Sequence, residues 1–405
     1  MNERSTLIII PALRARRGAG DTMILTRKFV DGLHQYAQRW PGPVTAWVGL
    51  NEEADTNLDH IEVAPDQGQL SLRWLSQDNA ELDETLSGAR FVLVSLVDEH
   101  LHLAERCTCR GIPLAFVSEY TLRTRCQIIR SETSNPLLRL RRELWTKGME
   151  RRIVHALHHA AGIQCNGTPT YEAYHRLTPR PLLYFDSRVG DSMLASDGDL
   201  AARTAELMGG SPLRLAFSGR LIAMKGPDHL PRVAAELKRL GVPFRMDICG
   251  AGALEDDIAA GIRKYDLSDV VTLNGVLEFH NELMPFVARN VDLFVCCHRQ
   301  GDPSCSYLET MACGTPIVGY DNEAFTGVVG ASGVGWLSPM DDPEQLAVII
   351  AEINRDRSAL VEAAAKARIF AAGHTFDKTM DARVDHMLDC CRQLESDLQR
   401  CRNSA

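Results

Sequence analysis

The stretch GDPSCSYLETMACGTPIVGYDNEAF, residues 301–325, decides the fold because it combines a helix start, a helix stop and a strand. Asp302 and Pro303 are typical of an N-cap followed by the first helical position. Gly314 ends the predicted helix after Cys313, and Pro316 prevents the helix from continuing. The β-branched run that follows predicts a strand, so the segment is one helix–strand step of an α/β domain.

The first turn of this helix is a candidate phosphate-binding site. It would point the backbone N–H groups of Ser304, Cys305 and Ser306 toward a ligand, with the positive end of the helix dipole behind them. Glu309 lies one turn deeper, where a carboxylate can accept hydrogen bonds from the hydroxyl pair of a nucleotide ribose. A capped helix with an ordinary, half-exposed glutamate fits this segment equally well.

On both sides of this stretch, short β-branched runs alternate with helical stretches, which predicts parallel strands joined by crossover helices. The first helix is expected from Thr22 to Trp40. The expected strands form two series: STLIII, PVTAWVGL, RFVLVSLV, IPLAFVSEY, AGIQCNG and RPLLYFDS, and then LRLAFSGRL, FRMDICGAG, VVTLNGVL, VDLFVCCH, TPIVGYD and GVGWLSP. We therefore expect an α/β fold with two Rossmann-like domains facing across a cleft, residues 1–190 and 213–375. Residues 191–212 would link them, and a helix over 376–405 could pack back on the N-terminal domain.

The composition is that of a globular protein and excludes several classes. A chain of 405 residues is too long for one ordinary core, and its net charge of −9 offers no support for a nucleic-acid binder. The twelve cysteines lack the spacing of a disulfide framework or a zinc ribbon and fit a reducing compartment. No secretory signal and no apolar run of about 20 residues is visible. We expect a cytoplasmic protein.

Two more segments place candidate ligand groups where strands end. FSGRLIAMKGPDHL puts Arg220 and Lys225 on the loop after a strand, where two cations would compensate the charge of a diphosphate. ICGAGALEDDI puts Gly250 and Gly252 in a strand-to-helix turn, where they would let a nucleotide approach closely. Solvated surface charge and a simple tight turn are the alternative interpretations.

Taken in order and spacing, these segments resemble a known family. SGRL, KG, ICGAGALEDDI, VTLNGVL, SYLETMACGTPIV and GWLSPMDDPEQLA resemble the C-terminal half of retaining GT-B glycosyltransferases, the sucrose-synthase-like and phosphatidylinositol-mannosyltransferase-like enzymes of group 1. The resemblance covers about residues 213–351. In the N-terminal half, RRGAGDTMILTRKFVDGL is similar to the glycine loop and first helix of that family.

The resemblance implies GT-B architecture and a nucleotide-diphosphate-sugar donor. It implies that Arg220 and Lys225 stabilise the leaving diphosphate, that Glu309 holds the ribose, and that Gly18 and Gly20 let the N-terminal loop close on the donor. Phosphate and sugar would be cradled by the first turn of the helix and by groups near it, namely Ser304, Cys305, Ser306 and Thr310. The acceptor would attack with retention of anomeric configuration, and no metal or other cofactor would be required.

Two positions depart from the family pattern. The family usually has a second acid eight positions before Glu309, which here is Gly301; Asp302 could substitute through a slight shift unless its side chain serves as an N-cap. The family also often has a histidine after an N-terminal strand. Glu119 could take that polar role, or His100 could.

Two further clusters lie outside these motifs. Residues 137–152 carry six basic side chains among leucines and one tryptophan, which is typical either of contact with an anionic membrane or of a solvated helix. His155, His158 and His159 could share a helix face, but the sequence indicates no acidic partner for them, which favours structural histidines over a zinc site.

The leading interpretation is a retaining glycosyltransferase of polysaccharide or glycoconjugate biosynthesis, acting on a carbohydrate or lipid-linked acceptor. Its location would be cytoplasmic, at the inner face of the membrane if the basic helix binds there. Two rivals remain: a GT-B sugar-nucleotide epimerase and a non-catalytic nucleotide-sugar-binding subunit, the second favoured by the missing acid.

Overall fold

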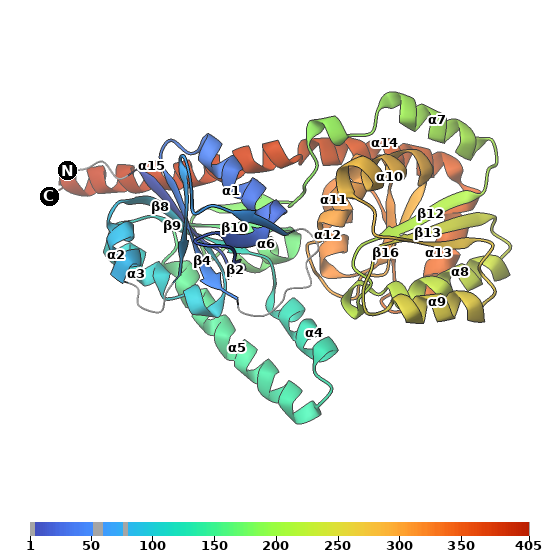
Figure 1. Ribbon diagram of the computed structural model, residues 1–405, viewed down its shortest axis with the longest axis horizontal. Helices are drawn as coiled ribbons and strands as arrows, with labels where there is room; N and C mark the ends of the chain where they lie inside the picture. The colour runs from blue at the N-terminus through green and yellow to red at the C-terminus, as the bar shows by residue number, and fades with distance from the viewer. Residues whose placement is uncertain (1–4, 52–59, 76–79, 405) are drawn as a thin grey trace.

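The computed structural model describes residues 5–51, 60–75 and 80–404. Two α/β domains lie side by side, each built on one sheet flanked by helices (Figure 1). The expected two-domain α/β fold is confirmed. The ends of the expected domains, residues 1–4 and 405, lie outside the described residues. Within the described part of the chain, no helix combines the length and apolar character needed to cross a membrane.

The N-terminal sheet has a parallel core in the order β7-β4-β1-β8-β9-β10-β11. Alternate residues of β1 enter separate apolar clusters on the two faces of the sheet: Leu7 and Ile9 lie on one face, Ile8 and Ile10 on the other. The chain order 3-2-1-4 puts a topological switch point between β1 and β8. These strands are β1 Thr6–Ile10, β4 Val44–Leu50, β7 Leu70–Trp74, β8 Ala89–Ser95, β9 Leu114–Ser118, β10 Gly162–Asn166 and β11 Pro181–Tyr184, with β6 Asp66–Gln67 antiparallel to β7.

An antiparallel hairpin precedes the first helix. Strands β2 (Arg14–Arg17) and β3 (Met23–Thr26) form it, and β3 also pairs with β5 (His60–Val63). Helix α1 therefore spans Arg27–Arg39, and the expectation that it starts at Thr22 is wrong. Met23 and Leu25 are buried while their neighbours are not, and this two-residue period is that of a strand.

The C-terminal sheet is parallel throughout, in the order β14-β13-β12-β15-β16-β17. In chain order this is 3-2-1-4-5-6, so the switch point lies between β12 and β15. The strands are β12 Leu213–Ser218, β13 Phe244–Cys249, β14 Val271–Gly275, β15 Leu293–Cys296, β16 Ile317–Tyr320 and β17 Trp336–Ser338.

Helices connect the strands in both domains. In the N-terminal domain these are α2 Ala80–Ser87, η1 Asp98–His100, α3 Leu103–Cys109, α4 Leu122–Glu132, α5 Pro136–His158 and α6 Thr168–Tyr174. In the C-terminal domain, with its approach and exit, they are η2 Asp191–Met193, α7 Asp197–Met208, η3 Ala223–Lys225, η4 Pro227–His229, α8 Leu230–Arg239, α9 Glu255–Lys264, η5 Phe279–Leu283, α10 Met284–Asn290, α11 Cys305–Ala312, α12 Glu323–Ser332, α13 Pro343–Arg355, α14 Arg357–Gly373 and α15 Phe376–Ser404.

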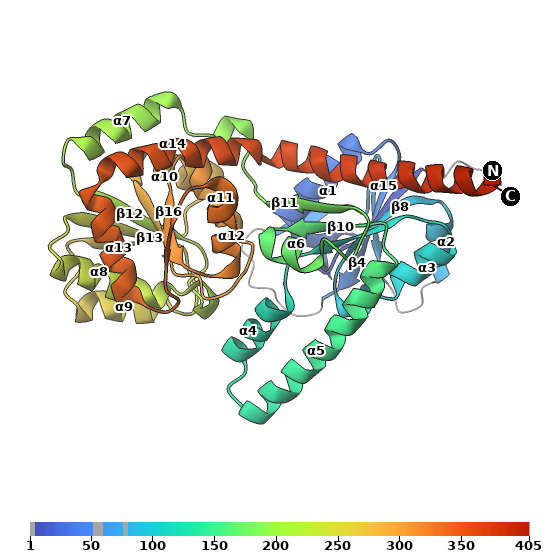
Figure 2. The same cartoon turned by 180° about the vertical axis from the view of Figure 1, so that it is seen from behind.

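Helix α15 crosses from the C-terminal domain back to the N-terminal domain and runs along its sheet beside α1 (Figure 2). Met380, Val384 and Met387 join the apolar cluster that contains Leu7 and Ile9. The last helix of the chain is thus part of the core of the first domain.

Helices α4 and α5 form a hairpin that projects from the N-terminal domain (Figures 1 and 2). Asn135 caps α5, its side-chain oxygen accepting hydrogen bonds from the amides of Leu137 and Leu138. The apolar side chains exposed near the tip are Leu137, Leu138, Leu140, Leu144 and Trp145.

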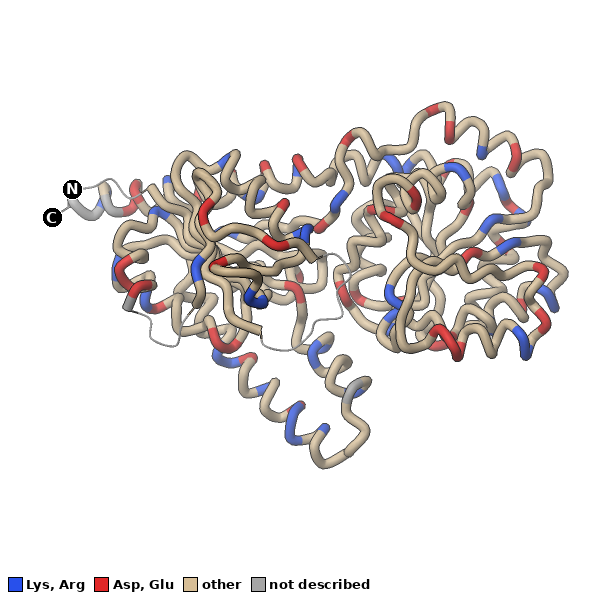
Figure 3. Tube along the Cα trace, in the orientation of Figure 1, with Lys and Arg blue, Asp and Glu red and all other residues tan. Residues whose placement is uncertain are grey.

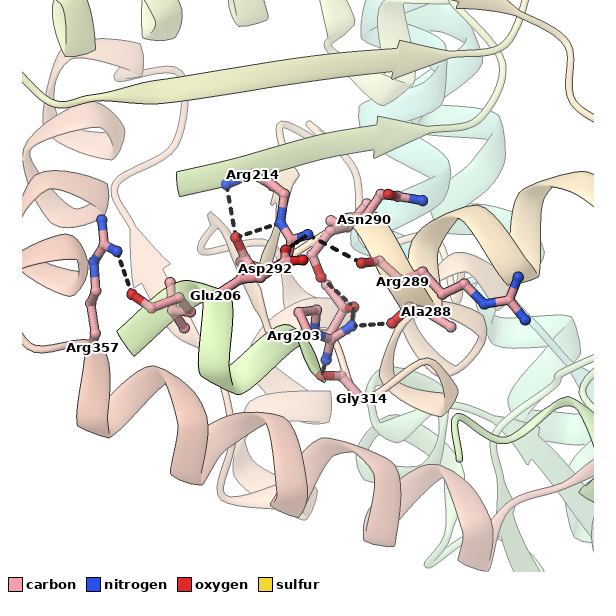
Figure 4. Close-up of polar contacts among 12 residues, drawn as sticks. Arg203, Glu206, Arg214, Ala288, Arg289, Asn290, Asp292, Gly314 and Arg357 are labelled. Atoms are coloured by element: carbon pink, nitrogen blue, oxygen red, sulfur yellow. Dashed lines mark hydrogen bonds and ion pairs between the residues drawn. The ribbon is translucent and has the colours of Figure 1, made fainter. Parts of the chain in front are cut away.

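Residues 191–212, which the sequence suggested as a linker, contain α7, and α7 carries a buried arginine. Arg203 Nη1 donates to the carbonyl oxygens of Ala288 at 3.0 Å and Cys313 at 3.1 Å, and Nη2 donates to that of Gly314 (Figure 4). One guanidinium therefore satisfies carbonyls at the C-terminal ends of both α10 and α11. Burial lowers the pKa of Arg203, which reflects the cost of removing its charge from water. The hydrogen bonds to these carbonyls offset that cost.

We expect Arg203→Met to lower the free energy of unfolding of the C-terminal domain by about 2–4 kcal/mol, because several buried carbonyls lose their donor. A urea titration followed by circular dichroism would measure it. Arg289→Met is the matched control: Arg289 is exposed and pairs with Asp199 at 3.3 Å, a contact worth about 0–1 kcal/mol. Equal effects of the two substitutions would contradict the capping role.

Candidate active site

The loop after β15 and the start of α11 lie at the switch point of the C-terminal sheet, where Lys225 reaches them. Lys225 Nζ donates to Asp302 Oδ2 at 2.6 Å and to Ser304 Oγ at 3.1 Å. Ser304 Oγ in turn bonds to Ser306 Oγ at 3.1 Å. Lys225 is 6% exposed, so its ammonium is held at this place by the fold. The structure thus brings together four residues that the sequence separates by up to 81 positions.

The expected start of α11 is wrong by two residues. Ser304, not Asp302, is the N-cap residue, and the backbone amide of Ser304 donates to the carbonyl of Asp302 at 2.8 Å. The Asp302 carboxylate is bound to Lys225 instead of to the helix. The first-turn amides of α11 are therefore those of Cys305 and Ser306, and the amide of Ser304 is not available as expected.

Glu309 is buried at 7% exposure, so the half-exposed glutamate considered from the sequence is excluded. Its Oε1 accepts a hydrogen bond from Arg188 Nε at 2.8 Å. The Arg188 guanidinium lies 3.8 Å from the centroid of the Phe279 ring. The sequence interpretation did not include Arg188, because this residue follows β11 in a stretch where the periodic pattern of apolar residues weakens. Thr310 is buried beside Glu309.

The glycines of the ICGAG turn pack against the loop that carries Arg220. A Cβ on Gly250 would lie 1.9 Å from the Gly219 carbonyl oxygen, and one on Gly252 would lie 2.5 Å from that of Leu221. The amide of Leu221 also donates to the Ala251 carbonyl at 2.9 Å. These glycines thus let the backbone of residues 250–252 approach the backbone of residues 219–221, whereas the sequence suggested the close approach of a nucleotide. Arg220 itself is exposed at the end of β12.

Gly18 and Gly20 lie at the tip of the β2–β3 hairpin. The Glu62 carboxylate accepts a hydrogen bond from the Ala19 amide at 2.6 Å and another from the Thr22 hydroxyl. These hydrogen bonds lower the pKa of Glu62. The contacts found for this tip are with its own sheet, and none joins it to the Lys225 cluster among the described residues.

A second ion pair joins the N-terminal domain to the start of α11. Lys28 at the beginning of α1 pairs with Asp186, and Lys28 Nζ lies 2.9 Å from Cys305 Sγ. Although burial lowers the pKa of Lys28, the attraction and hydrogen bonding of Asp186 and Cys305 together outweigh it, and the pKa is raised well above its ordinary value. Lys28 therefore adds a cation to the site that sequence reasoning missed. Its sequence signal is its place at the start of the helix that follows the glycine loop and β3.

A cavity of about 800 Å³ opens at the switch point of the N-terminal sheet. It is lined mainly by apolar groups of β1, β8, α1 and α15, with Lys28, Glu119, Tyr120 and Asp186 among its polar lining residues. Besides burial, the charge of Asp302 raises the pKa of both Glu119 and Tyr120, so the cavity and the Lys225 cluster approach each other at these two residues.

Glu119 is exposed, and it is one of the residues that line this cavity. Loss of hydration there, together with repulsion by Asp186, raises the pKa of Glu119, and Lys28 opposes the shift. His100, the alternative for the same role, is buried with its pKa lowered, and it is not among the lining residues of the cavity.

His298 is a further buried group that the sequence interpretation missed. Its Nδ1 lies 3.1 Å from the Tyr307 hydroxyl, and its Nε2 has no partner among the described residues. Burial, reinforced by the Lys225 charge, lowers its pKa well below the ordinary value, so the imidazole is neutral at physiological pH. It follows β15 directly, and a polar residue at the end of a buried strand is the signal that points to it.

Comparison with known proteins finds a family match in the C-terminal half of the chain and similar folds over nearly all of it. A family model described as Glycosyl transferases group 1 matches residues 203–370. The chain is 30% identical over 166 residues to WcaL of Salmonella typhimurium, named for colanic acid biosynthesis, and 28% identical over 163 residues to the amylovoran biosynthesis glycosyltransferase AmsK of Erwinia amylovora. Each match covers 39% of this chain and 40% of the relative, so the chain spans about two fifths of the length of these relatives.

Two solved structures are similar over nearly the whole chain. Anabaena HepE in complex with UDP-glucose has a TM-score of 0.62 at 15% identity and covers 95% of this chain and 99% of its own. WaaG, described as involved in lipopolysaccharide biosynthesis, has a TM-score of 0.59 at 14% identity and covers 94% and 99%. The expected GT-B architecture is thereby confirmed.

The raised pKa of Glu119 has a consequence for stability. The Glu119 carboxyl group binds its proton more tightly in the folded protein than in the unfolded chain. Ionisation of Glu119 therefore lowers the free energy of unfolding as pH rises above about 4.3. We expect Glu119→Gln to raise the melting temperature at about pH 8 and to lose this advantage toward about pH 4. Glu99→Gln is the control, since Glu99 lines the same cavity but pairs with Arg14 at 3.0 Å. A Glu119→Gln effect that does not change with pH would contradict the assignment.

Proposed function

Residues 203–370 belong to the family described as glycosyl transferases group 1, and on that premise we propose that this protein is a glycosyltransferase. It transfers a sugar from a nucleotide-diphosphate-sugar donor to an acceptor, with retention of anomeric configuration, in polysaccharide or glycoconjugate biosynthesis. The observation that carries the proposal is the buried Lys225 ammonium, held against Asp302 and Ser304 at the start of α11.

The donor diphosphate would lie between Lys225 and the first turn of α11. Lys225 and the amides of Cys305 and Ser306 would stabilise the charge that develops on the leaving diphosphate, with Arg220 closing over it from the end of β12. An ammonium has three donors, so Lys225 can bind a phosphate oxygen while it keeps one bond to Asp302. Most of the catalytic effect would come from positioning and charge stabilisation, and no metal is invoked.

The sugar would meet the acceptor beside Glu119. Glu119 belongs to the lining of the N-terminal cavity, and the charges of both Asp186 and Asp302 act on it. In this proposal it would accept a hydrogen bond from a hydroxyl of the sugar or the acceptor where the two domains face each other. Glu309, buried and bonded to Arg188, would bind the ribose on the nucleotide side.

One observation favours the second candidate, a non-catalytic nucleotide-sugar-binding subunit. The position of the missing acid is Gly301, and the neighbouring Asp302 is engaged by Lys225. Such a subunit would bind the donor without releasing nucleotide, and donor turnover decides between the two.

We also propose that the tip of the α4–α5 hairpin, residues 137–147, contacts an anionic membrane. Within this tip segment, the acidic side chain of Glu143 is paired with Arg130 of α4 at 2.8 Å. The tip therefore presents Arg141 and Lys147 together with Leu140 and its exposed apolar neighbours, a combination that suits acidic lipid headgroups. Figure 3 shows basic positions along the projecting hairpin. This contact would bring a lipid-linked acceptor toward the cavity, since Trp145 of α5 is also one of its lining residues.

We expect Lys225→Ala to slow release of nucleotide from a UDP-sugar panel by at least about 100-fold, because the leaving diphosphate loses its buried cation. The measurement is coupled detection of free nucleotide with and without acceptor. Lys238→Ala on α8, an exposed lysine, is the control and should keep wild-type turnover.

Three results would each remove part of the proposal. Unchanged turnover in Lys225→Ala would remove the leaving-group role. Release that needs no acceptor and yields an altered free sugar would identify an epimerase. Calorimetric binding without any release in the wild type would identify the inert subunit.

We expect wild-type protein to sediment with vesicles that contain phosphatidylglycerol, and the variant Leu140→Glu/Leu144→Glu to remain in the supernatant. Arg141→Glu should weaken binding at low salt and have less effect at high salt, where charges are screened. Ile369→Glu replaces an apolar residue on α14 that is at least as exposed as Leu140 and Leu144, and it should leave sedimentation unchanged. Absence of wild-type sedimentation at low salt would dispose of the membrane contact.

A further inference from the structure

The fold supplies an acid to the histidines at the end of α5 that the sequence did not indicate. Glu105 on α3 lies next to them: its Oε1 is 2.8 Å from His155 Nε2. The His155 and His159 rings have centroids 4.9 Å apart. One possible ligand atom from each of Glu105, His155 and His159 lies within 4.8 Å of the others.

The backbones that carry these three side chains are fixed to each other. His155 and His159 are one helical turn apart, so their side chains project from the same side of α5. The Thr108 hydroxyl of α3 donates to the carbonyl of His159 at 2.9 Å, which ties the end of α5 to α3. All three side chains are exposed, so small rotamer changes can converge their ligand atoms without disturbing the core.

We propose that Glu105, His155 and His159 form a surface site for a divalent transition-metal cation, with zinc as the cation that suits it best. Two imidazole nitrogens and one carboxylate oxygen are ligands that zinc accepts, and a water molecule would complete four-fold coordination. The carboxylate and the imidazole now share a hydrogen bond, which metal binding would replace by two metal–ligand bonds. His158 does not belong to the cluster.

The cation would join α3 to the base of α5, the helix whose other end forms the projecting tip. Neither the Lys225 cluster nor the N-terminal cavity includes any of the three ligands. The site is therefore independent of the proposed glycosyl transfer and would stand if that proposal failed. Binding to the folded chain alone would raise its melting temperature.

The test is metal binding to tag-free full-length protein, freed of metal by chelation beforehand. Zn²⁺ is titrated against a colorimetric chelator, Co²⁺ absorption reports coordination geometry, and the melting temperature is followed in parallel. We expect one tight zinc ion per chain, and affinities at least about tenfold weaker in Glu105→Gln and in His159→Ala. His158→Ala and Cys109→Ser should keep wild-type affinity; the latter removes the exposed thiol one turn after Glu105.

Each other result overturns the proposal. Absence of binding in the wild type would leave Glu105 and His155 as a hydrogen-bonded surface pair. Equal affinity in wild type, Glu105→Gln and His159→Ala would put the cation elsewhere. Loss of binding in Cys109→Ser with binding kept in His159→Ala would assign the zinc to the thiol.

Discussion

The Arg203 guanidinium holds α11 in place, and the residues proposed to bind the donor lie at the start of α11. Because it binds carbonyls at the C-terminal ends of α10 and α11, it satisfies groups that would otherwise be buried without a donor. The opposite end of α11 is thereby directed toward the N-terminal domain. There, Ser304 and Ser306 lie beside Lys225, at the point where the order of the parallel strands reverses.

Ion pairs surround the start and the inner face of α11. Lys225 pairs with Asp302, Lys28 with Asp186, and Arg188 with Glu309. Each pair lies partly buried at the domain boundary. The attraction between its two opposite charges offsets part of the desolvation cost of burying them. An anionic ligand would compete with the carboxylates for the two lysines. Asp186 and Arg188 both follow β11, the last strand of the N-terminal sheet, so the chain that leaves this sheet takes part in the site.

The surroundings of Glu119 and His298, two polar residues near the domain boundary, shift their pKa values in opposite directions. Loss of hydration and the nearby carboxylate of Asp186 raise the pKa of Glu119, whereas burial beside Lys225 lowers the pKa of His298. The first group is therefore poised to hold a proton more readily than a free carboxyl, and the second is a neutral imidazole. The N-terminal domain thus contributes an acid with a raised pKa and the C-terminal domain a buried neutral imidazole, although the two sheets share the strand order 3-2-1-4.

The sequence by itself determined the two-domain α/β fold, the six C-terminal strands, and β1, β4, β8, β9, β10 and β11 of the N-terminal sheet, because apolar runs and glycine-rich turns are local properties of the chain. It missed the short strands β2, β3, β5, β6 and β7, and it placed β3 inside the first helix. It also resembled the family whose model matches residues 203–370. It also singled out Lys225 and Glu309. Only the tertiary structure decided their partners, Asp302 and Arg188, and showed that Asp302 is not the helix cap that its neighbour Pro303 suggests. Likewise it brought Glu105 to His155 across 50 positions. The reason is physical: a capping side chain is chosen by competition with every other donor and acceptor in reach, and residues distant in the chain enter that competition only after the sheets and helices have packed.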